Sequence, residues 1–486
     1  MTDQRRSSPT EKNHPSMKYT LAEFFCGCGG TSRGFTRSGR FNVLLGNDVK
    51  PEALRTYAYN HRNDEIAPAT IRQDIRTLKV SAIEDALKER GVRPGDLDCL
   101  LGGPPCQGFS QLRRSEHRDE GEIRKFRGYS QLAHDPRNDL VLRYLEVAEA
   151  LRPKFLVIEN VPQMLNHGFD GRLGKLSEIV IEMLEKDLGY SVEVAVVNSA
   201  DYGVPQLRER AIFIASSIGP ASLPPATHRD PSKLVDGVEL LPWVTVGDAI
   251  GDLPEPSMKE DLLGGGGLDL YRGEPSAYGR LMRTSANFPY NHITRAYKNS
   301  IIETIKEMRP GQTWDAESAR MRLAYEQSIA ALAKEKEITE QVARRLLEKS
   351  GAIKPVFYKD YYWSAYSRLS PDAPALTITA NANFLGSGRF THPTENRGIT
   401  MREAARLQSF DDDFRFITSD NDDMDTTRIG IGMDMVGEAV PPLLGKAIAE
   451  HLAGQLDARR QAPAAPAPAR GAEKKPKNKE RKTELA

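Results

Sequence analysis

The sequence predicts an α/β protein, in which a parallel β-sheet is covered by helices on both faces. From residue 19, short apolar runs alternate with segments of helical length, and this β-α-β rhythm is typical of parallel sheets. Glycines and polar residues follow the apolar runs, at the strand ends where such sheets bind ligands. The chain has 486 residues, of which 39% are hydrophobic and 28% charged, so it is long enough for a large core and several domains.

The individual elements follow from the apolar runs and from helix start and stop signals. A helix over 51–61 begins with proline, which suits the first helical position, and a helix over 138–153 stops at Pro153. A helix over 175–190 closes at Gly189. The expected strands are 19–25, 41–48, 97–103, 154–161, 191–199 and 210–216. The other expected helices are 299–308, about 315–350, and 439–456.

Changes in composition divide the chain into parts. The β-α rhythm stops near residue 256, and the last segment is rich in Pro and Ala and then in Lys, so it cannot bury a core. We expect a disordered leader at 1–17, an α/β domain at 18–256, a second, smaller domain at 257–427, a helix at 428–457 that returns to the first domain, and a disordered basic tail at 458–486.

Composition also excludes several classes of protein. The sequence has no run of eighteen apolar residues, and its polar start lacks the apolar region of a signal peptide. Four cysteines in a chain of this length do not make a disulfide framework, and Cys26 and Cys28 lack a partner pair at zinc spacing. We therefore expect a cytoplasmic protein with no membrane association and no metal. Lys and Arg balance Asp and Glu at 67 each, so net charge does not indicate a partner.

Cys106 stands in the stretch LLGGPPCQGFS, residues 100–110. Pro104 and Pro105 fix their backbone φ angles and donate no hydrogen bond, while the flanking glycines allow turns and close approach. Such a stretch favours a rigid loop over a helix or a central strand. A cysteine held there is a candidate nucleophile, and the alternative is a structural cysteine, which normally lies buried on a regular element.

The stretch FFCGCGGTSRG, residues 24–34, follows an expected strand and precedes a helix. Its glycines permit a ligand to approach the backbone at a helix N-terminus. Asp48 ends the next strand, where an acid can bind two ribose hydroxyls, so the two features together suggest an adenosine-containing cofactor. The alternative is a tight packing turn followed by a solvated Asp, because the pattern departs from the dinucleotide fingerprint Gly-x-Gly-x-x-Gly.

An ordered set of motifs resembles the DNA cytosine-5 methyltransferases. From about residue 18 to 457 the order and spacing match for FFCGCGG, ND, DI, GGPPCQGFS, ENV, QLRER, RGITMREAARLQSF and GEAVPPLL. The resemblance implies a Rossmann-like sheet that depends on S-adenosylmethionine, with the second domain as a target-recognition domain. It also implies a monomer that acts on double-stranded DNA, with a cognate restriction endonuclease, if one exists, acting separately.

The resemblance also assigns roles to individual residues. Cys106 would add to C6 of cytosine, so that C5 can attack a methyl group. Glu159, as a neutral acid, would donate to N3, and Arg210 would hold O2. Arg208 would support the loop or a phosphate. The target base must leave the stacked duplex for this chemistry.

The cofactor contacts are likewise implied by the family match. They are Phe25, Gly27, Gly29, Gly30, Asp48, Val49, Asp74, Ile75, Pro105 and Leu140. One departure is Glu438, in Gly437-Glu438-Ala439-Val440, where the family usually has Asn. Base readout falls within 257–396, where 283–298 and 381–390 have suitable side chains. The sequence does not reveal the recognised DNA site or the role of the additional residues 113–133.

Three other functions remain open at this point. A methyltransferase of the same fold that acts on transfer RNA is the first, although the long recognition region favours DNA. A nicotinamide oxidoreductase is suggested by the glycine turn alone, and it has no use for Cys106 beside Glu159 and Arg210. A non-catalytic DNA-binding regulator is the third, and the retention of those three residues argues against it.

Overall fold

The structure is a computed structural model, which describes residues 18–105, 138–166, 175–233, 239–258, 270–271, 273–284, 288–361, 363–418 and 428–461. The principal strands are β1 (Tyr19–Phe24), β2 (Phe41–Asp48), β3 (Ala69–Arg72), β4 (Cys99–Gly102), β5 (Phe155–Asn160), β6 (Ser191–Asn198) and β8 (Glu209–Ser216). The short strands are β7 (Gln206–Leu207), β9 (His228–Arg229), β10 (Leu241–Pro242), β11 (Ser257–Met258), β12 (Ile293–Thr294) and β13 (Ala375–Leu376).

The helices form two groups, one that packs on the large sheet and one that lies elsewhere. Those associated with the large sheet are α1 (Gly30–Arg37), α2 (Pro51–His61), α3 (Val80–Lys88), α5 (Asn138–Leu151), α6 (Lys175–Glu182) and α15 (Pro442–Gln461). The others are α7 (Val246–Ile250), α9 (Ala277–Met282), α10 (Asn299–Lys306), α11 (Trp314–Lys336), α12 (Glu340–Lys349), α13 (Met401–Leu407) and α14 (Ile429–Glu438).

The large sheet has seven strands in the order β3-β2-β1-β4-β5-β8-β6. The α/β class is confirmed, but the expectation of an entirely parallel sheet is wrong, because β8 runs antiparallel to both β5 and β6. The reversal matters for function. An antiparallel strand begins at the edge where its neighbours end, so the start of β8 lies beside the carboxyl end of β5.

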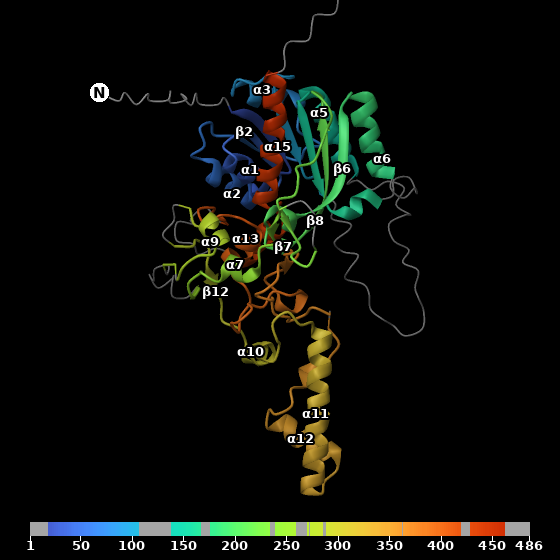
Figure 1. Cartoon of the computed structure of the whole chain (residues 1–486), viewed down its shortest axis with the longest axis vertical. Coiled ribbons are helices and arrows are strands. Elements are labelled where there is room, and N and C mark those ends of the chain that lie inside the picture. The colour runs from blue at the N-terminus through green and yellow to red at the C-terminus, as the bar shows by residue number, and fades with distance from the viewer. Residues whose placement is uncertain are drawn as a thin grey trace, which may run out of the picture.

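Helices cover both faces of the sheet, as expected (Figure 1). On one face, α3, α5 and α6 pack through Ile83, Tyr144 and Val180 onto alternate residues of the strands, such as Ala22 and Phe24. On the other face, α1, α2 and α15 pack onto the intervening residues, such as Tyr19 and Leu21. This alternation is the period of two that a strand imposes on its side chains.

The last helix, α15, makes a close crossing with the first. α15 lies against α1, and a Cβ placed on Gly34 would be 2.2 Å from the carbonyl oxygen of Pro442. The sequence reading missed β3 and α3. Strand β3 has four residues with a half-exposed pattern at the sheet edge, so it lacks the apolar run that identified the other strands.

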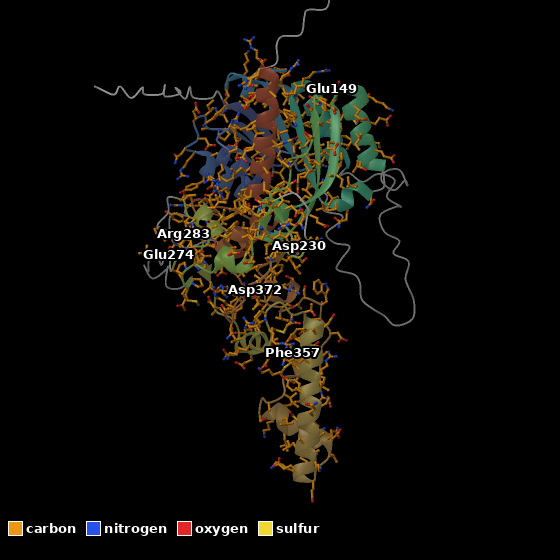
Figure 2. All side chains as sticks on the ribbon, viewed as in Figure 1. Glu149, Asp230, Glu274, Arg283, Phe357 and Asp372 are labelled. Carbon is orange, nitrogen blue, oxygen red and sulfur yellow. The ribbon has the colours of Figure 1, made fainter. Side chains whose placement is uncertain are left out.

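The region between β8 and α15 contains two further clusters of buried apolar side chains. One joins α7, α9, α13 and α14 and includes Val246 and Met433, so it extends beyond both limits predicted for the second domain. Those limits stay a prediction. The other cluster is separate and holds α11 and α12 together around Trp314, which stacks on Phe357 with ring centroids 5.3 Å apart. These two helices project away from the sheet, and Phe357 lies where the projection begins (Figures 1 and 2).

The predicted leader and almost all of the predicted tail lie outside the described residues, as does the additional segment 113–133. Among the described helices, none combines the length and apolar character needed to cross a membrane.

Candidate active site

The glycine turn joins β1 to α1 in a conformation that requires its glycines. Phe25, Gly27 and Gly29 have φ angles of 54°, 53° and 94°, in the left-handed region that favours glycine. A Cβ on Gly29 would be 2.9 Å from the Tyr57 ring, and one on Gly30 would be 2.2 Å from the carbonyl oxygen of Val440. A Cβ on Gly27 would meet nothing within 4 Å. The turn is therefore packed tightly against Tyr57 and Val440 at Gly29 and Gly30, and it is open at Gly27.

Asp48, at the end of β2, is oriented by backbone groups. Its Oδ2 accepts from the Gly27 amide at 2.9 Å, and its Oδ1 accepts from the Lys50 amide at 2.8 Å. Each carboxylate oxygen can accept a second hydrogen bond. The open glycine and the fixed carboxylate at neighbouring strand ends fit a ligand that carries ribose hydroxyls.

The other residues predicted to contact a cofactor lie along the same edge of the sheet. The Asp74 carboxylate accepts from Arg76 at 2.5 Å, and this hydrogen bond lowers the pKa of Asp74. Ile75 is buried, whereas Val49 is 55% exposed. Leu140, on α5, is partly buried in the cluster that also includes Phe25. Pro105 is the last described residue after β4.

Glu159 and Arg210 form an ion pair at the junction of β5 and β8. Arg210 Nε lies 2.7 Å from Glu159 Oε1, and the two side chains are only 11% and 20% exposed. Burial lowers the pKa of Arg210, and the Glu159 carboxylate opposes this shift. The pair is formed because β8 runs antiparallel, with Ala211 opposite Asn160. The structure thus brings together two residues that are 51 positions apart in sequence.

Arg208 has a different environment from Arg210, although only one residue separates them. Its guanidinium is buried and donates to the carbonyl oxygens of Ile378, Gly437 and Ala439, each at 3.0 Å. Burial lowers its pKa well below the ordinary value. The family resemblance left two roles for Arg208, support of a loop or contact with a phosphate. These contacts favour support, and the backbone that Arg208 holds is at residue 378 and at residues 437–439.

The loop that leads to Cys106 is anchored next to Glu159. The Asn160 amide donates to the carbonyl oxygen of Pro104 at 2.9 Å, and a Cβ on Gly103 would be 3.4 Å from Glu159 Oε2. Cys106 itself lies outside the described residues. The role of Asn160 in holding this loop was not predicted, although a polar residue at the end of an apolar strand was the available signal.

Comparison with known proteins identifies the family. The family model for C-5 cytosine-specific DNA methylase matches residues 19–454. The chain belongs to this family. Type II methyltransferase M.AgeI of Thalassovita gelatinovora is 30% identical over 463 residues, which cover 88% of this chain and 98% of that protein. DNA (cytosine-5)-methyltransferase 1 of Mus musculus is 26% identical, and the match covers 89% of this chain and 28% of that protein.

A solved structure supports the fold of this methylase. A protein described as a DNA modification methyltransferase encoded within a prophage (E. coli) superposes with a TM-score of 0.57 at 20% sequence identity. The match covers 90% of this chain and 100% of that structure. The resemblance seen in the motifs is thus confirmed, as is the Rossmann-like methyltransferase sheet.

Beneath the glycine turn of the methylase lies a buried polar group that the sequence reading missed. Glu23, on β1, is 4% exposed, and its Oε2 has no hydrogen-bond partner among the described residues. Burial raises the pKa of Glu23 to about 8. The nearby Ser32 hydroxyl lies 3.2 Å from the Gly29 carbonyl oxygen and 2.9 Å from His61 Nε2. The turn therefore rests on polar groups from three elements.

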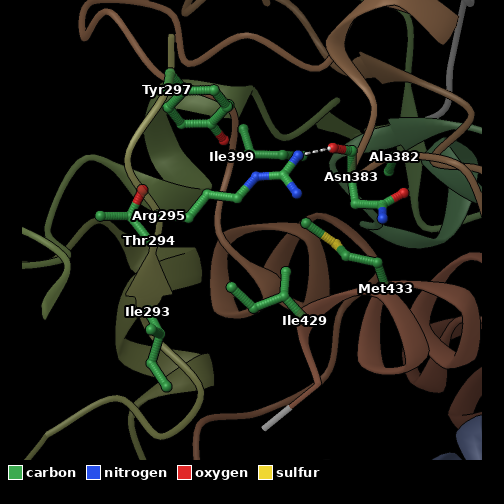
Figure 3. Close-up of a pocket in the computed structure, with 10 residues that line it drawn as sticks. Ile293, Thr294, Arg295, Tyr297, Ala382, Asn383, Ile399, Ile429 and Met433 are labelled. Atoms are coloured by element: carbon green, nitrogen blue, oxygen red, sulfur yellow. Dashed lines mark hydrogen bonds between the residues drawn. The ribbon is translucent and has the colours of Figure 1, made fainter. Parts of the chain in front are cut away.

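The two segments considered for base readout meet at a pocket of the methylase (Figure 3). The exposed Arg295 comes from 283–298, and its guanidinium donates to the carbonyl oxygen of Asn383, from 381–390, at 2.6 Å. Ile399 and Met433 contribute apolar walls. The described residues contain no cluster of potential metal ligands.

Proposed function

We propose that this methylase transfers a methyl group from S-adenosylmethionine to C5 of a cytosine within a specific short sequence of double-stranded DNA. The observation that carries the proposal is the Glu159–Arg210 pair, at 2.7 Å, beside the anchored loop that leads to Cys106. The glycine turn ends β1, and β1 pairs with β4, so the proposed cofactor edge adjoins this pair within one sheet.

The proposed chemistry uses three side chains on the base. The Cys106 thiolate forms a bond to C6, and the electron pair displaced from the C5–C6 double bond makes C5 nucleophilic. Glu159, when protonated, donates to N3, and Arg210 donates to O2, so both stabilise the charge that develops on the ring. Bound S-adenosylmethionine would supply an electrophilic methyl group, so that C5 gains the bond to the methyl carbon and the sulfur keeps the electron pair of the broken S–CH3 bond. Loss of the C5 proton to a base then expels the thiolate and restores the double bond.

The cofactor is proposed to contact Phe25, Gly27, Gly29, Gly30, Asp48, Val49, Asp74, Ile75, Pro105 and Leu140. The open space at Gly27 and the orientation of Asp48 support this set. The cytosine must rotate out of the duplex to reach Glu159, which costs a few kcal/mol. Residues of 283–298 and 381–390 are proposed to read the surrounding bases, because the fold brings both segments to one surface.

DNA is favoured over transfer RNA as the substrate. The type II methyltransferases that resemble the chain along almost their whole length support DNA, as does the long region between β8 and α15. The Glu159–Arg210 pair, which is largely shielded from solvent, also argues against a regulator that has lost catalysis. We propose that the protein acts as a monomer in the cytoplasm, with any cognate endonuclease acting separately.

Bisulfite sequencing of DNA from cells that express the chain tests the proposal. We expect protected cytosines confined to one short motif with the natural chain and none with Cys106→Ala. Cys99→Ala is the matched control, because Cys99 is fully buried in β4 and should leave protection intact. Full protection with Cys106→Ala would refute the covalent mechanism, and a lack of protection with the natural chain would refute DNA as the substrate.

A further inference from the structure

Lys50 and Glu438 form an ion pair between segments that are 388 residues apart in sequence. Lys50 Nζ lies 2.6 Å and 2.5 Å from the two carboxylate oxygens of Glu438. Each side chain is 47% exposed, so the pair is half-solvated. Both oxygens of the Glu438 carboxylate contact the same ammonium group, so the two side chains hold one another in a defined position.

Lys50 is part of the structure that orients Asp48. Its backbone amide donates to Asp48 Oδ1, while Asp48 Oδ2 accepts from Gly27. Lys50 also stands immediately before α2, which begins at Pro51. A contact that holds the Lys50 side chain therefore also helps to hold the turn that carries Asp48, the proposed acceptor of the ribose hydroxyls.

Glu438 belongs to a segment that lies against the other side of the glycine turn. The carbonyl oxygen of Val440 would be 2.2 Å from a Cβ on Gly30, so the backbone of this segment contacts the first residue of α1. The carbonyl oxygens of Gly437 and Ala439, on either side of Glu438, accept from Arg208. The backbone on both sides of Glu438 is thus held while its side chain reaches outward to Lys50.

Lys50 interacts with a second carboxylate besides that of Glu438. Asp434 lies one helical turn before Glu438, and its pKa is raised by burial and by repulsion from Glu438. Lys50 opposes that shift. Among the described groups that shift the pKa of Asp434, Lys50 is the cation that balances the acids.

We propose that Lys50 and Glu438 are positioning residues for the cofactor, which tie the turn after β2 to the turn after α14 across the cofactor edge. This inference rests on the proposed use of S-adenosylmethionine. The pair fixes the distance between the Asp48 side and the Gly30 side of the site. Because both side chains are half-exposed, the affinity for the cofactor should depend on ionic strength through this pair.

The test is a double-mutant cycle on the full chain, with calorimetric titration of S-adenosylmethionine and, separately, of S-adenosylhomocysteine. At low salt we expect Lys50→Met and Glu438→Gln each to weaken binding by about two- to fivefold, the range for a half-exposed ion pair. The double variant should bind no more weakly than either single variant, and the exchange Lys50→Glu with Glu438→Lys should restore affinity. At high salt the differences should disappear.

The matched control is Lys186→Met, which removes an exposed Lys–Glu pair of similar length, 2.7 Å, between Glu182 at the end of α6 and the π-helical turn Met183–Asp187. It should leave both affinities unchanged. Unchanged affinity in the two single variants, additive losses, or a failed exchange would overturn the inference while leaving the proposed function in place. If the natural chain binds neither ligand, the proposed cofactor itself is wrong, and the inference falls with it.

Discussion

The two edges that make up the site are built in different ways. At the cofactor edge, the glycine turn and Asp48 lie within 24 residues of one another and are held by backbone hydrogen bonds and left-handed glycines. At the target-base edge, Glu159 and Arg210 are charged side chains from β5 and β8, which are separated in the chain by α6, β6 and β7. The first geometry is local in sequence, and the second depends on the strand order of the sheet.

The contrast extends to the residues that support each edge. The cofactor edge rests on Glu23, Ser32 and Tyr57, which are buried under the turn. The target-base edge rests on Arg208, whose acceptors come from residues 378, 437 and 439, far along the chain. A substitution at the cofactor edge should therefore disturb mainly the glycine turn. Loss of the buried Arg208 side chain at the target-base edge should affect the stability of the whole fold.

The largest effect is expected where Arg208 and Arg210 are compared. Arg208→Met would leave three carbonyl oxygens without their donors, and it should destabilise the fold by about 3 kcal/mol or more. Arg210→Met would leave the Glu159 carboxylate without its partner, so it should also destabilise the fold, but by less than Arg208→Met because both side chains of that pair keep some contact with solvent. It should slow methyl transfer by about 100-fold or more, the usual cost of one charge-stabilising donor. Thermal unfolding and single-turnover transfer measure the two effects. If thermal unfolding showed the same loss of stability in both variants, the distinction between a supporting Arg208 and a catalytic Arg210 would be wrong.

The next largest effect concerns Glu23 and pH. Its folded-state pKa of about 8 exceeds the ordinary 4.5, so the folded chain keeps a proton that the unfolded chain releases above about pH 4.5. Stability should therefore fall from pH 4.5 to 8 and then level off. Glu23→Gln should remove most of this dependence, because its amide does not ionise.

Chemical unfolding of the natural chain and of Glu23→Gln across that pH range measures the difference. Glu193→Gln, on the edge strand β6, is a suitable control for a Glu-to-Gln change. Parallel stability curves for the natural chain and Glu23→Gln would show that Glu23 does not carry the buried proton.

The smallest effect separates two glycines of the same turn. Gly30→Ala would place a Cβ 2.2 Å from a backbone oxygen that cannot easily move, so it should cost about 2–3 kcal/mol of stability and weaken cofactor binding. Gly27→Ala meets no atom and should cost only about 1 kcal/mol, from its left-handed backbone. Urea unfolding of both variants gives the comparison. A larger loss at Gly27 than at Gly30 would contradict the packing described for the turn.

The sequence alone determined the α/β class, the strands of the large sheet except β3, most of the helices that cover it, and the glycine turn with Asp48. These features depend on local patterns: apolar runs of strand length, proline at the start of α2, and glycines where φ must be positive. It also indicated Glu159 and Arg210 through family motifs, and the comparisons confirmed that family. It missed β3 because four half-exposed residues give little apolar signal.

Only the tertiary structure decided which arginine pairs with Glu159 and which one holds the backbone. Arg208 and Arg210 stand two positions apart in one motif, and the family resemblance gave them different roles but not these contacts. The reversal of β8 places Arg210 beside the end of β5, while Arg208 is enclosed by residues 378 and 437–439. The pairing of Lys50 with Glu438 has the same origin, because contacts across hundreds of residues are created by packing and leave no periodic trace in the chain.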